Sequence, residues 1–184
     1  MTTITLTALH YVDYSAQGED SAEMIAEIVR LVHAYNREHG NVLGLDFPGW
    51  VAGESFAGAQ QVRVFGEKEQ LAVFIRQPRA VRLMSMGDVA RSMVARVPVG
   101  AGAAAVVRDS AADKNKPSHA RRRERRGVGV FSGERAKPQF GVAFTSKSTG
   151  QEFLLKMKKR VAEAAEAVQF NSYGLCLQGG VPQF

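Results

Sequence analysis

Basic side chains crowd into one segment of the chain, residues 114–126, and their spacing suits contact with phosphate groups. The segment holds seven of the 24 Lys and Arg residues: Lys114, Lys116, Arg121, Arg122, Arg123, Arg125 and Arg126. With one acid among them, the local charge of +6 equals the net charge of the whole chain. Guanidinium groups form paired hydrogen bonds with phosphate oxygens, so the segment favours binding of a polyanion, most commonly nucleic acid. A solvated basic loop is the alternative that the segment alone leaves open.

The same segment predicts a short helix with a cationic face. Pro117-Ser118 is a suitable helix start and Gly127 a suitable stop. At 100° per residue, four arginines fall within an arc of about 140°: Arg121, Arg122, Arg125 and Arg126. Like charges four residues apart repel, so we expect this helix to be frayed alone and ordered by its ligand.

Composition narrows the chemistry that the remaining residues can perform. The single Cys176 excludes an internal disulfide and a multi-cysteine metal site, which suits a reducing cytoplasm, and we expect it to be a buried core residue. The four histidines show no metal-ligand spacing, so no metal site is predicted. No apolar stretch reaches the ~18 residues of a membrane span, and the N-terminus lacks the pattern of a signal peptide.

The first half of the chain predicts strands and helices in the order of a β-α-β-β-α-β unit. Apolar residues alternate from Thr3 to Val12 as in a half-buried strand, and Glu19 to His39 has helical spacing closed by Gly40. The other predicted elements are strands at residues 42–47 and 61–65, a short helix at residues 67–75 broken at Pro78, and a strand within residues 86–97. This order is typical of a ferredoxin-like sheet with helices on one face.

Beyond residue 98 the composition changes and indicates a second, smaller unit. Gly100 to Ala105 is almost only Gly and Ala, too small to fill a core, and predicts a linker. Strands are expected at residues 141–146, 152–157 and 170–177, with a short helix over Val161 to Val168. The predicted fold class is α+β: a ferredoxin-like domain over residues 1–98, a linker over residues 99–117, and a smaller C-terminal α/β domain over residues 118–184 that carries the arginine-rich helix.

Several short motifs occur in an order that resembles one known family. They are the helix carrying His33, Gly44-Leu-Asp-Phe-Pro48, the arginine-rich segment, Thr145-Ser-Lys-Ser-Thr-Gly-Gln-Glu-Phe153, Tyr173-Gly-Leu175, and the closing Gly179-Gly-Val-Pro-Gln-Phe184. The family is the CRISPR-associated endoribonuclease that processes precursor CRISPR RNA in type I-F systems. No single motif is specific, but the combination is, and it covers roughly residues 28–48, 106–126 and 140–184.

The resemblance implies an activity and a catalytic site. Members of the family cut once at the 3′ base of a hairpin in each repeat, need no metal ion, and leave a 2′,3′-cyclic phosphate and a 5′-hydroxyl. His33 then matches the residue that transfers a proton, Ser146 the serine that holds the attacking 2′-OH, and Tyr173 the tyrosine that orients the histidine. An imidazole titrates near neutral pH, which suits it to proton transfer. No cofactor is expected.

The resemblance also implies which residues contact the RNA. In the family, three arginines spaced i, i+3 and i+4 lie in the major groove of the hairpin, and Arg122, Arg125 and Arg126 reproduce that spacing. Counting from Pro117 instead moves the last of the three to Gly127, so two registers stay open, and the expected RNA-binding set also keeps Arg121 and Arg123. Contacts from other segments are expected at Arg108, Ser148, Thr149, Gln151 and Phe153, whose ring would stack on the terminal base pair.

The sequence departs from the family at two positions. Ser110 stands where a glutamine reads the base of the stem, so that recognition is expected to differ. Gln183 stands where a tryptophan precedes the final phenylalanine. We therefore expect the residues that pack against this tryptophan in the family to contact Gln183 in this chain.

The candidate catalytic residues also have ordinary structural interpretations. His33 lies at the border of the apolar stripe of its helix, where a packed or solvated histidine is commoner than a catalyst. Tyr173 alternates with Leu175 like a core residue, and Ser146 shares a strand face with Phe144. The resemblance to the family, and not the periodicity of the sequence, favours catalytic roles for these residues over the structural interpretations.

The expected partners follow from the resemblance. They are the CRISPR repeat RNA hairpin, as precursor and as mature CRISPR RNA, and other protein subunits of a type I CRISPR surveillance complex, with no membrane and a cytoplasmic location. Two other functions stay open. One is a non-catalytic RNA-hairpin-binding subunit of such a complex, and the other is an unrelated basic RNA-binding structural protein.

Overall fold

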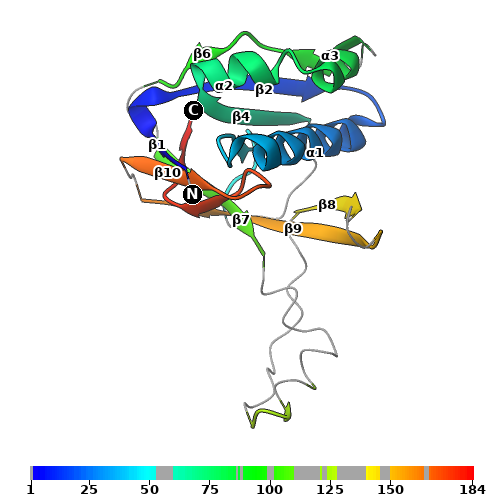
Figure 1. Cartoon of the computed structure of the whole chain (residues 1–184), viewed down its shortest axis with the longest axis vertical. Helices are drawn as coiled ribbons and strands as arrows, with labels where there is room; N and C mark the ends of the chain where they lie inside the picture. Colours follow the sequence, from blue (N-terminus) through cyan, green and yellow to red (C-terminus); the bar gives the residue numbers. More distant parts are fainter. Residues whose placement is uncertain are drawn as a thin grey trace.

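A computed structural model of the chain describes residues 2–52, 60–85, 87, 89–98, 102–109, 121, 124–127, 140–145, 150–163 and 166–184. Helices and antiparallel sheets are both present, so the predicted α+β class is confirmed (Figure 1). The elements follow one another as β1 (Thr3–Thr5), the 3-10 helix η1 (Leu6–Ala8), β2 (Leu9–Ala16), α1 (Ser21–His39), β3 (Gly44–Asp46), β4 (Gln61–Glu67), α2 (Lys68–Phe74), α3 (Pro78–Ser85), β5 (Val89–Arg91), β6 (Ala95–Arg96), β7 (Gly102–Arg108), β8 (Phe140–Thr145), β9 (Glu152–Val161), β10 (Ala167–Phe170), β11 (Cys176–Gln178) and β12 (Val181–Gln183).

The first sheet has the strand order β3-β4-β2-β5, and β6 also pairs with β2. Its pairings are antiparallel, with β2 running along β4 from Leu9 opposite Glu67 to Ser15 opposite Gln61. The chain passes through these elements in the predicted order of strand, helix, strand, strand, helix and strand. The second helix is divided into α2 and α3 because Pro78, whose ring nitrogen has no hydrogen to donate, begins a new helix.

Helix α1 carries the candidate histidine and is buried on the sides that face two sheets. Its apolar residues, among them Ile25 and Val32, share one core with residues of β2 and β4 and with Phe144 and Leu155 of β8 and β9. Figure 1 shows α1 between the β2–β4 layer and the β8–β9 layer. Gly40 has φ +91° and ends the helix at His39, as predicted, because glycine adopts the left-handed conformation without a Cβ clash.

The small residues after residue 98 form a strand, so the linker prediction is wrong for residues 102–108. β7 pairs with both β9 and β12 in the sheet β12-β7-β9-β8, and Ala104 and Ala105 are buried. A Cβ at Gly180, beside β12, would lie 3.0 Å from the Ala104 carbonyl oxygen. Small side chains here permit close approach of neighbouring backbones. A Gly- and Ala-rich composition is found both in such closely packed strands and in flexible linkers, so composition alone does not distinguish the two.

The predicted strand from Thr3 to Val12 is two strands in two different sheets. The 3-10 helix η1 interrupts it, and β1 leaves the first sheet to pair with β10, in the order β1-β10-β11. The N-terminal strand therefore joins a sheet built from the C-terminal part of the chain. Alternating apolar residues report a buried strand face, but they do not report which sheet supplies the partner.

Two predictions for the C-terminal part are also wrong. The helix expected over Val161 to Val168 is replaced by the end of β9 and the start of β10, with residues 164 and 165 outside the described residues. The strand expected over residues 170–177 is interrupted by a turn at residues 171–175, so Tyr173 lies in that turn and not in a strand. Helix propensity gives way here to pairing with neighbouring strands.

A second core lies on the other face of the first sheet. Leu9 and Phe65 of β2 and β4 pack there with Phe170, Cys176 and Val181. Cys176 is 5% exposed, so its predicted core position is confirmed, and burial raises the pKa of its thiol to about 12.

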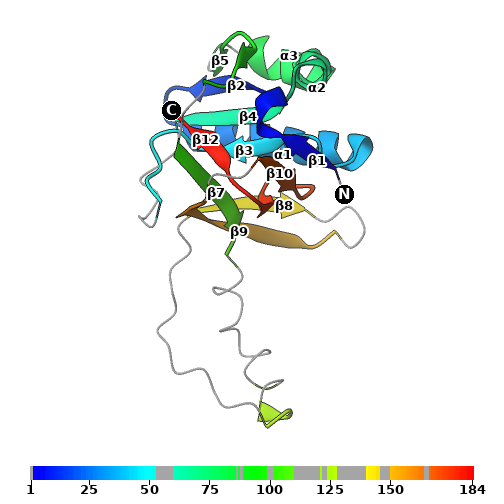
Figure 2. The same ribbon diagram turned by 90° about the vertical axis from the view of Figure 1, so that its left-hand side faces the viewer.

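The described part of the arginine-rich segment lies apart from the rest of the chain. In Figures 1 and 2, residues 121 and 124–127 are at the far end of the molecule, beyond the β7–β9–β8 sheet. The first sheet, with α2 and α3, is at the opposite end. Among the helices that the structure describes, none is long and apolar enough to cross a membrane.

Candidate active site

His33 is half-buried on α1 and is held by a backbone carbonyl from a distant segment. Its Nδ1 atom lies 3.0 Å from the carbonyl oxygen of Ser172. Because a carbonyl oxygen only accepts hydrogen bonds, Nδ1 carries a proton in this contact. In the neutral ring, Nε2 then carries the lone pair that can take up another proton.

Tyr173 covers one face of the His33 ring. The two rings are stacked, with centroids 4.1 Å apart and planes 4° from parallel. Phe144 of β8 meets both rings edge-on, at 5.5 Å from His33 and 5.2 Å from Tyr173. The structure therefore brings together the predicted His33 and Tyr173, which are far apart in the sequence, in an aromatic cluster with Phe144.

Phe153, at the start of β9, extends this cluster toward solvent. Its ring stacks on Phe144 with centroids 5.7 Å apart and lies 6.4 Å from Tyr173. The side chain is 37% exposed, so part of an apolar ring remains accessible beside the histidine. An accessible aromatic ring of this kind can stack on a nucleic-acid base.

A compact turn at residues 171–175 presents both Tyr173 and the Ser172 carbonyl to α1. The Asn171 side-chain oxygen accepts from the amides of Tyr173 and Leu175, at 2.8 and 3.1 Å. Gly174, with φ +76°, donates its amide to the Asn171 carbonyl at 3.0 Å. Such turns favour asparagine at the first position, because its side chain accepts hydrogen bonds from backbone amides of the same turn. They favour glycine at the fourth position, because glycine adopts positive φ without strain.

Several predicted site residues lie outside the described residues. These are Ser146, Ser148, Thr149, Arg122 and Arg123, so their predicted roles stay predictions. Gln151 is described and is exposed directly before β9. In the sequence, the predicted serines lie between Thr145, at the end of β8, and this residue.

Of the arginines predicted to contact RNA, the four that the structure describes are exposed and lie on two elements. Arg108 ends β7. Arg121 and Arg125 belong to a helical turn in which the Arg125 amide donates to the Arg121 carbonyl at 3.1 Å, with Arg126 next to it. Gly127 has φ +64° and donates to the Glu124 carbonyl, so the predicted stop is confirmed. The predicted start at Pro117-Ser118 lies outside the described residues.

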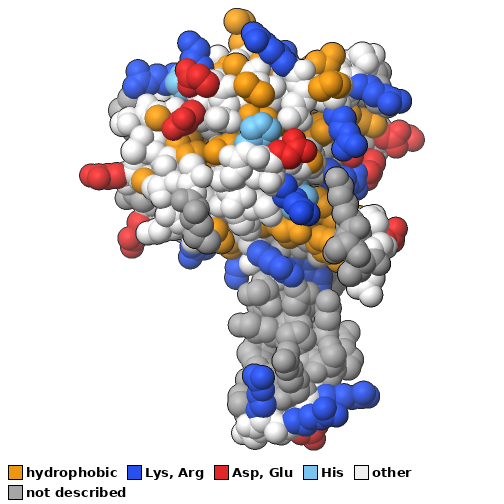
Figure 3. All heavy atoms as spheres, viewed as in Figure 1, with side chains coloured by type: hydrophobic (Ala, Val, Ile, Leu, Met, Phe, Trp, Pro, Cys, Tyr) orange, Lys and Arg blue, Asp and Glu red, His pale blue; other side chains and the backbone are white. Residues whose placement is uncertain are grey.

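Figure 3 shows basic side chains at the lower end of the molecule, where Figure 1 places this helical turn. More basic side chains lie on the underside of the body, toward that end. The basic side chains of the helical turn and those on the underside of the body therefore lie toward the same end of the molecule. A polyanion bound there can contact the helical turn and the body together.

His39, the nearest alternative to His33 in the sequence, has no neighbours from the β8 and β9 hairpin among the described contacts. Its Nδ1 atom lies 3.0 Å from the carbonyl oxygen of Tyr35, on its own helix, and its ring stacks on that tyrosine. It is exposed at the helix end. Its surroundings are thus local to α1.

Gln183, which stands at one of the unusual positions, makes a polar contact with a buried ion pair. Its side-chain amide donates to Asp46 at 3.0 Å, and Lys159 lies 2.8 Å from the other oxygen of the same carboxylate. Lys159 also donates to the Phe47 carbonyl at 3.2 Å. These contacts join β3, β9 and β12, and none of them involves His33, Tyr173, Phe144 or Phe153.

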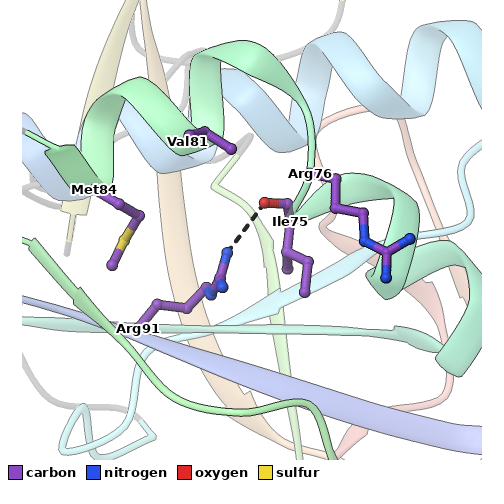
Figure 4. A pocket seen from close by; sticks show the side chains of 5 residues that line it. All are labelled: Ile75, Arg76, Val81, Met84 and Arg91. Carbon is purple, nitrogen blue, oxygen red and sulfur yellow. Dashed lines mark hydrogen bonds between the residues drawn. The ribbon is translucent and has the colours of Figure 1, made fainter.

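Sequence reasoning missed Phe144 and Asn171 as parts of this site. Phe144 alternates with Val142 and has the pattern of a core residue, so no sequence signal separated it from its neighbours. The spacing of Asn171 and Gly174 is a turn signal that could have been recognised. A pocket elsewhere, lined by Ile75, Arg76, Val81, Met84 and Arg91, contains no residue of the cluster (Figure 4).

Two comparisons with known proteins bear on this arrangement. A search of curated proteins found no match. The family described as "CRISPR-associated protein (Cas_Csy4)" matches residues 11–184, which include α1, the aromatic cluster, the arginine-rich segment and the C-terminal strands. Within the described residues, no group of three or more His, Cys, Asp or Glu side chains is arranged to hold a metal ion. The chain belongs to the Csy4 family of CRISPR-associated proteins, which are endoribonucleases that process CRISPR RNA.

Proposed function

We propose that this protein cleaves precursor CRISPR RNA at the 3′ base of the repeat hairpin, without a metal ion, and remains bound to the processed guide RNA. The observation that carries the proposal is the His33 ring, stacked on Tyr173 with Nδ1 held by the Ser172 carbonyl, in a chain of this family. This contact directs the proton of the neutral ring to Nδ1, so that Nε2 is the atom suited to accept a proton from a substrate.

The proposed reaction is an internal transesterification. The 2′-oxygen of the nucleotide at the cut attacks the adjacent phosphorus, and the bond from phosphorus to the 5′-oxygen breaks. His33 takes up the proton of the 2′-OH, and the departing 5′-oxygen takes a proton from water, which leaves a 2′,3′-cyclic phosphate and a 5′-hydroxyl. Ser146 is proposed to hold the 2′-OH in line with the phosphorus, since alignment of the reacting atoms supplies much of the rate.

RNA binding is proposed to use two surfaces of the chain. The helical turn with Arg121, Arg125 and Arg126 contacts the hairpin stem together with Arg122 and Arg123, and Arg108 contacts the base of the stem. Phe153 stacks on the terminal base pair beside the cut, a contact worth ~1–3 kcal/mol per base. Ser148, Thr149 and Gln151 are proposed to contact the nucleotides next to the cleaved bond.

The proposed division of the chain follows these two tasks. The sheet β3-β4-β2-β5 with α1, α2 and α3 has the element order of a ferredoxin-like unit and supplies His33. The part beyond residue 118 supplies the arginine-rich helix, Phe153 and Tyr173, and Arg108 lies in the segment between the two parts. Other subunits of a type I surveillance complex in the cytoplasm are the proposed protein partners, and retention of the product predicts a single turnover.

Cleavage of repeat RNA in the presence of EDTA tests the proposal. The RNA carries the hairpin of a repeat from the same genome, and a matched RNA has hydrogen in place of the one 2′-OH at the cut. We expect cleavage of the first RNA alone, equal binding of both, and a 2′,3′-cyclic phosphate by end-group analysis. Binding of the intact hairpin without cleavage would instead indicate a non-catalytic subunit, and cleavage of the deoxy-substituted RNA would reject the 2′-OH mechanism.

A further inference from the structure

The contacts that hold the 171–175 turn extend into α1 through a buried asparagine. Asn36 lies one helical turn after His33 and is 1% exposed. Its side chain donates to the Leu43 carbonyl and accepts from the Leu43 amide, both at 2.8 Å. The Nδ2 atom of Asn36 also donates to the Asn171 carbonyl oxygen, at 3.4 Å. Asn36 thus connects the helix that carries His33 to the first residue of the turn.

The turn itself depends on the Asn171 side chain. Its oxygen accepts two backbone amides, while the Asn171 amide and carbonyl pair with Leu175 and Gly174 at 2.9 and 3.0 Å. The Gly174 carbonyl in turn accepts from the Leu45 amide of β3 at 2.9 Å. Ser172 lies inside this closed set of contacts, so the direction of its carbonyl is determined by Asn171 and its neighbours.

We propose that Asn171, supported by Asn36, is a positioning residue that selects the proton-bearing nitrogen of His33. The inference rests on the proposed function for its catalytic consequence. Asn171 holds the Ser172 carbonyl toward Nδ1, so the neutral ring keeps its proton there and presents the lone pair on Nε2. Without a fixed acceptor at Nδ1, the neutral imidazole distributes its proton over both nitrogens, and the form with Nε2 protonated cannot take up a proton from the substrate.

The tautomer is measurable without RNA. Nitrogen NMR of the histidine rings separates Nδ1–H from Nε2–H, and the signals missing from His33→Ala assign those of His33. We expect wild-type His33, at a pH where the ring is neutral, to be protonated on Nδ1. We expect a mixture of both forms in Asn171→Ala. Wild-type signals showing protonation on Nε2 would overturn the inference without any variant at Asn171.

Rescue by a conservative change separates positioning from folding. Asn171→Asp retains the oxygen that accepts the Tyr173 and Leu175 amides, whereas Asn171→Ala removes it. We expect Asn171→Ala to slow single-turnover cleavage at saturating RNA by about 10-fold or more, but by less than complete loss of the general base, which is worth about 10²–10⁴-fold. Asn171→Asp should recover most of that loss. Hairpin affinity should stay within a few fold of wild type in both variants.

A control variant on α3 tests whether a general loss of stability, rather than loss of the turn, would change the tautomer or slow cleavage. Leu83→Ala removes a buried side chain from α3, outside the turn and the cluster. We expect it to lower the melting temperature without changing the tautomer or the cleavage rate at a temperature where it is folded. Equal slowing by Leu83→Ala and Asn171→Ala, or an unchanged Nδ1–H form in folded Asn171→Ala, would overturn the positioning role.

The two proposals fail in different measurements. Full cleavage by His33→Ala would reject the proposed catalytic function, whereas the NMR signals of the free protein would still decide what Asn171 does to the ring. If His33→Ala abolishes cleavage but the tautomer of His33 is the same in Asn171→Ala as in wild type, only the positioning role of Asn171 is rejected.

Discussion

His33 and His39 lie on the same helix and have similar immediate contacts. In each, the Nδ1 atom lies 3.0 Å from a backbone carbonyl oxygen. Each ring also stacks on a tyrosine ring, with centroids 4.1 Å apart for His33 and 3.9 Å apart for His39. The source of the contacts separates them. Those of His39 come from its own helix, whereas those of His33 come from β8 and from the 171–175 turn. A site built from several segments, with an accessible aromatic ring beside it, can hold a substrate that a helix end alone cannot.

Replacing these two histidines in parallel tests this distinction at the residue scale. We expect His33→Ala to slow cleavage by about 10²–10⁴-fold, the contribution of a general acid–base group, while hairpin affinity changes by a few fold at most. His39→Ala is the matched control and should cleave within a few fold of wild type. Both are measured as single-turnover rates at saturating RNA with affinity determined separately. The assignment of His33 would be wrong if the two variants lost activity equally.

At the scale of elements, short turns position the chemistry and bring distant strands into register. Gly174 illustrates this because it lies at φ +76° and a Cβ on it would come within 2.9 Å of the Leu45 side chain and 3.1 Å of Val32. Its carbonyl also accepts from the Leu45 amide. The turn thus fits closely against β3 and α1 at once, and the stack of Tyr173 on His33 depends on that fit.

Gly174→Ala should therefore destabilise the protein and slow cleavage. We expect a loss of about 1–3 kcal/mol in the free energy of unfolding, from the positive φ together with the steric conflict. Gly49→Ala is the matched control, because Gly49 has φ +82° with nothing within 4 Å of the added Cβ, so it isolates the cost of the backbone conformation. Urea unfolding of both variants measures the difference. Equal losses would mean that the contact with Leu45 and Val32 yields without cost.

The arginine-bearing turn makes a separate prediction about RNA affinity. Arg125→Ala combined with Arg126→Ala should weaken hairpin binding and reduce the slope of log affinity against log salt by ~0.7–0.9 for each phosphate that the protein no longer neutralises. Arg79→Ala with Arg82→Ala, on α3 at the other end of the molecule, removes the same charge from exposed positions (Figure 1). We expect the slope of this control to match wild type. A common slope in all three proteins would place the turn away from the RNA backbone.

At the scale of the whole molecule, buried charges connect the separate sheets. Lys159 of β9 and Asp46 of β3 are 2% and 3% exposed and 2.8 Å apart, and Gln183 of β12 donates to the same carboxylate. Arg63 of β4 pairs with Asp13 of β2 at 2.7 Å. It also donates to the Phe184 carbonyl at 3.0 Å, which attaches the C-terminal residue to the first sheet.

Removing one member of the buried pair should cost more than removing both charges. Lys159→Met leaves Asp46 without its cation in a buried position, and we expect a loss of about 3–5 kcal/mol in the free energy of unfolding. Adding Asp46→Asn removes the remaining charge and should recover much of that loss. Chemical unfolding of the single and double variants provides the measurement. Additive losses in the double variant would show that the two charges do not stabilise each other.

Local features of the sequence determined the parts of the protein that need no distant partner. The helical spacing of residues 19–39 with Gly40, the stop at Gly127 and the break at Pro78 all follow from the conformational limits of single residues. The order of short motifs also identified the family, which the match over residues 11–184 confirms. The predicted pairing of His33 with Tyr173 came from that resemblance, because periodicity alone indicated a core residue in a strand.

Only the tertiary structure decided which segments pair and what surrounds the histidine. Gly102–Arg108 is a strand because β9 and β12 flank it, and the first strand divides because β10 takes up β1. The stack on His33 depends on a turn more than a hundred residues away, held by Asn171 and Asn36. Contacts of this kind form between segments that are adjacent only after folding, so their free energies have no signature in the local sequence at either end.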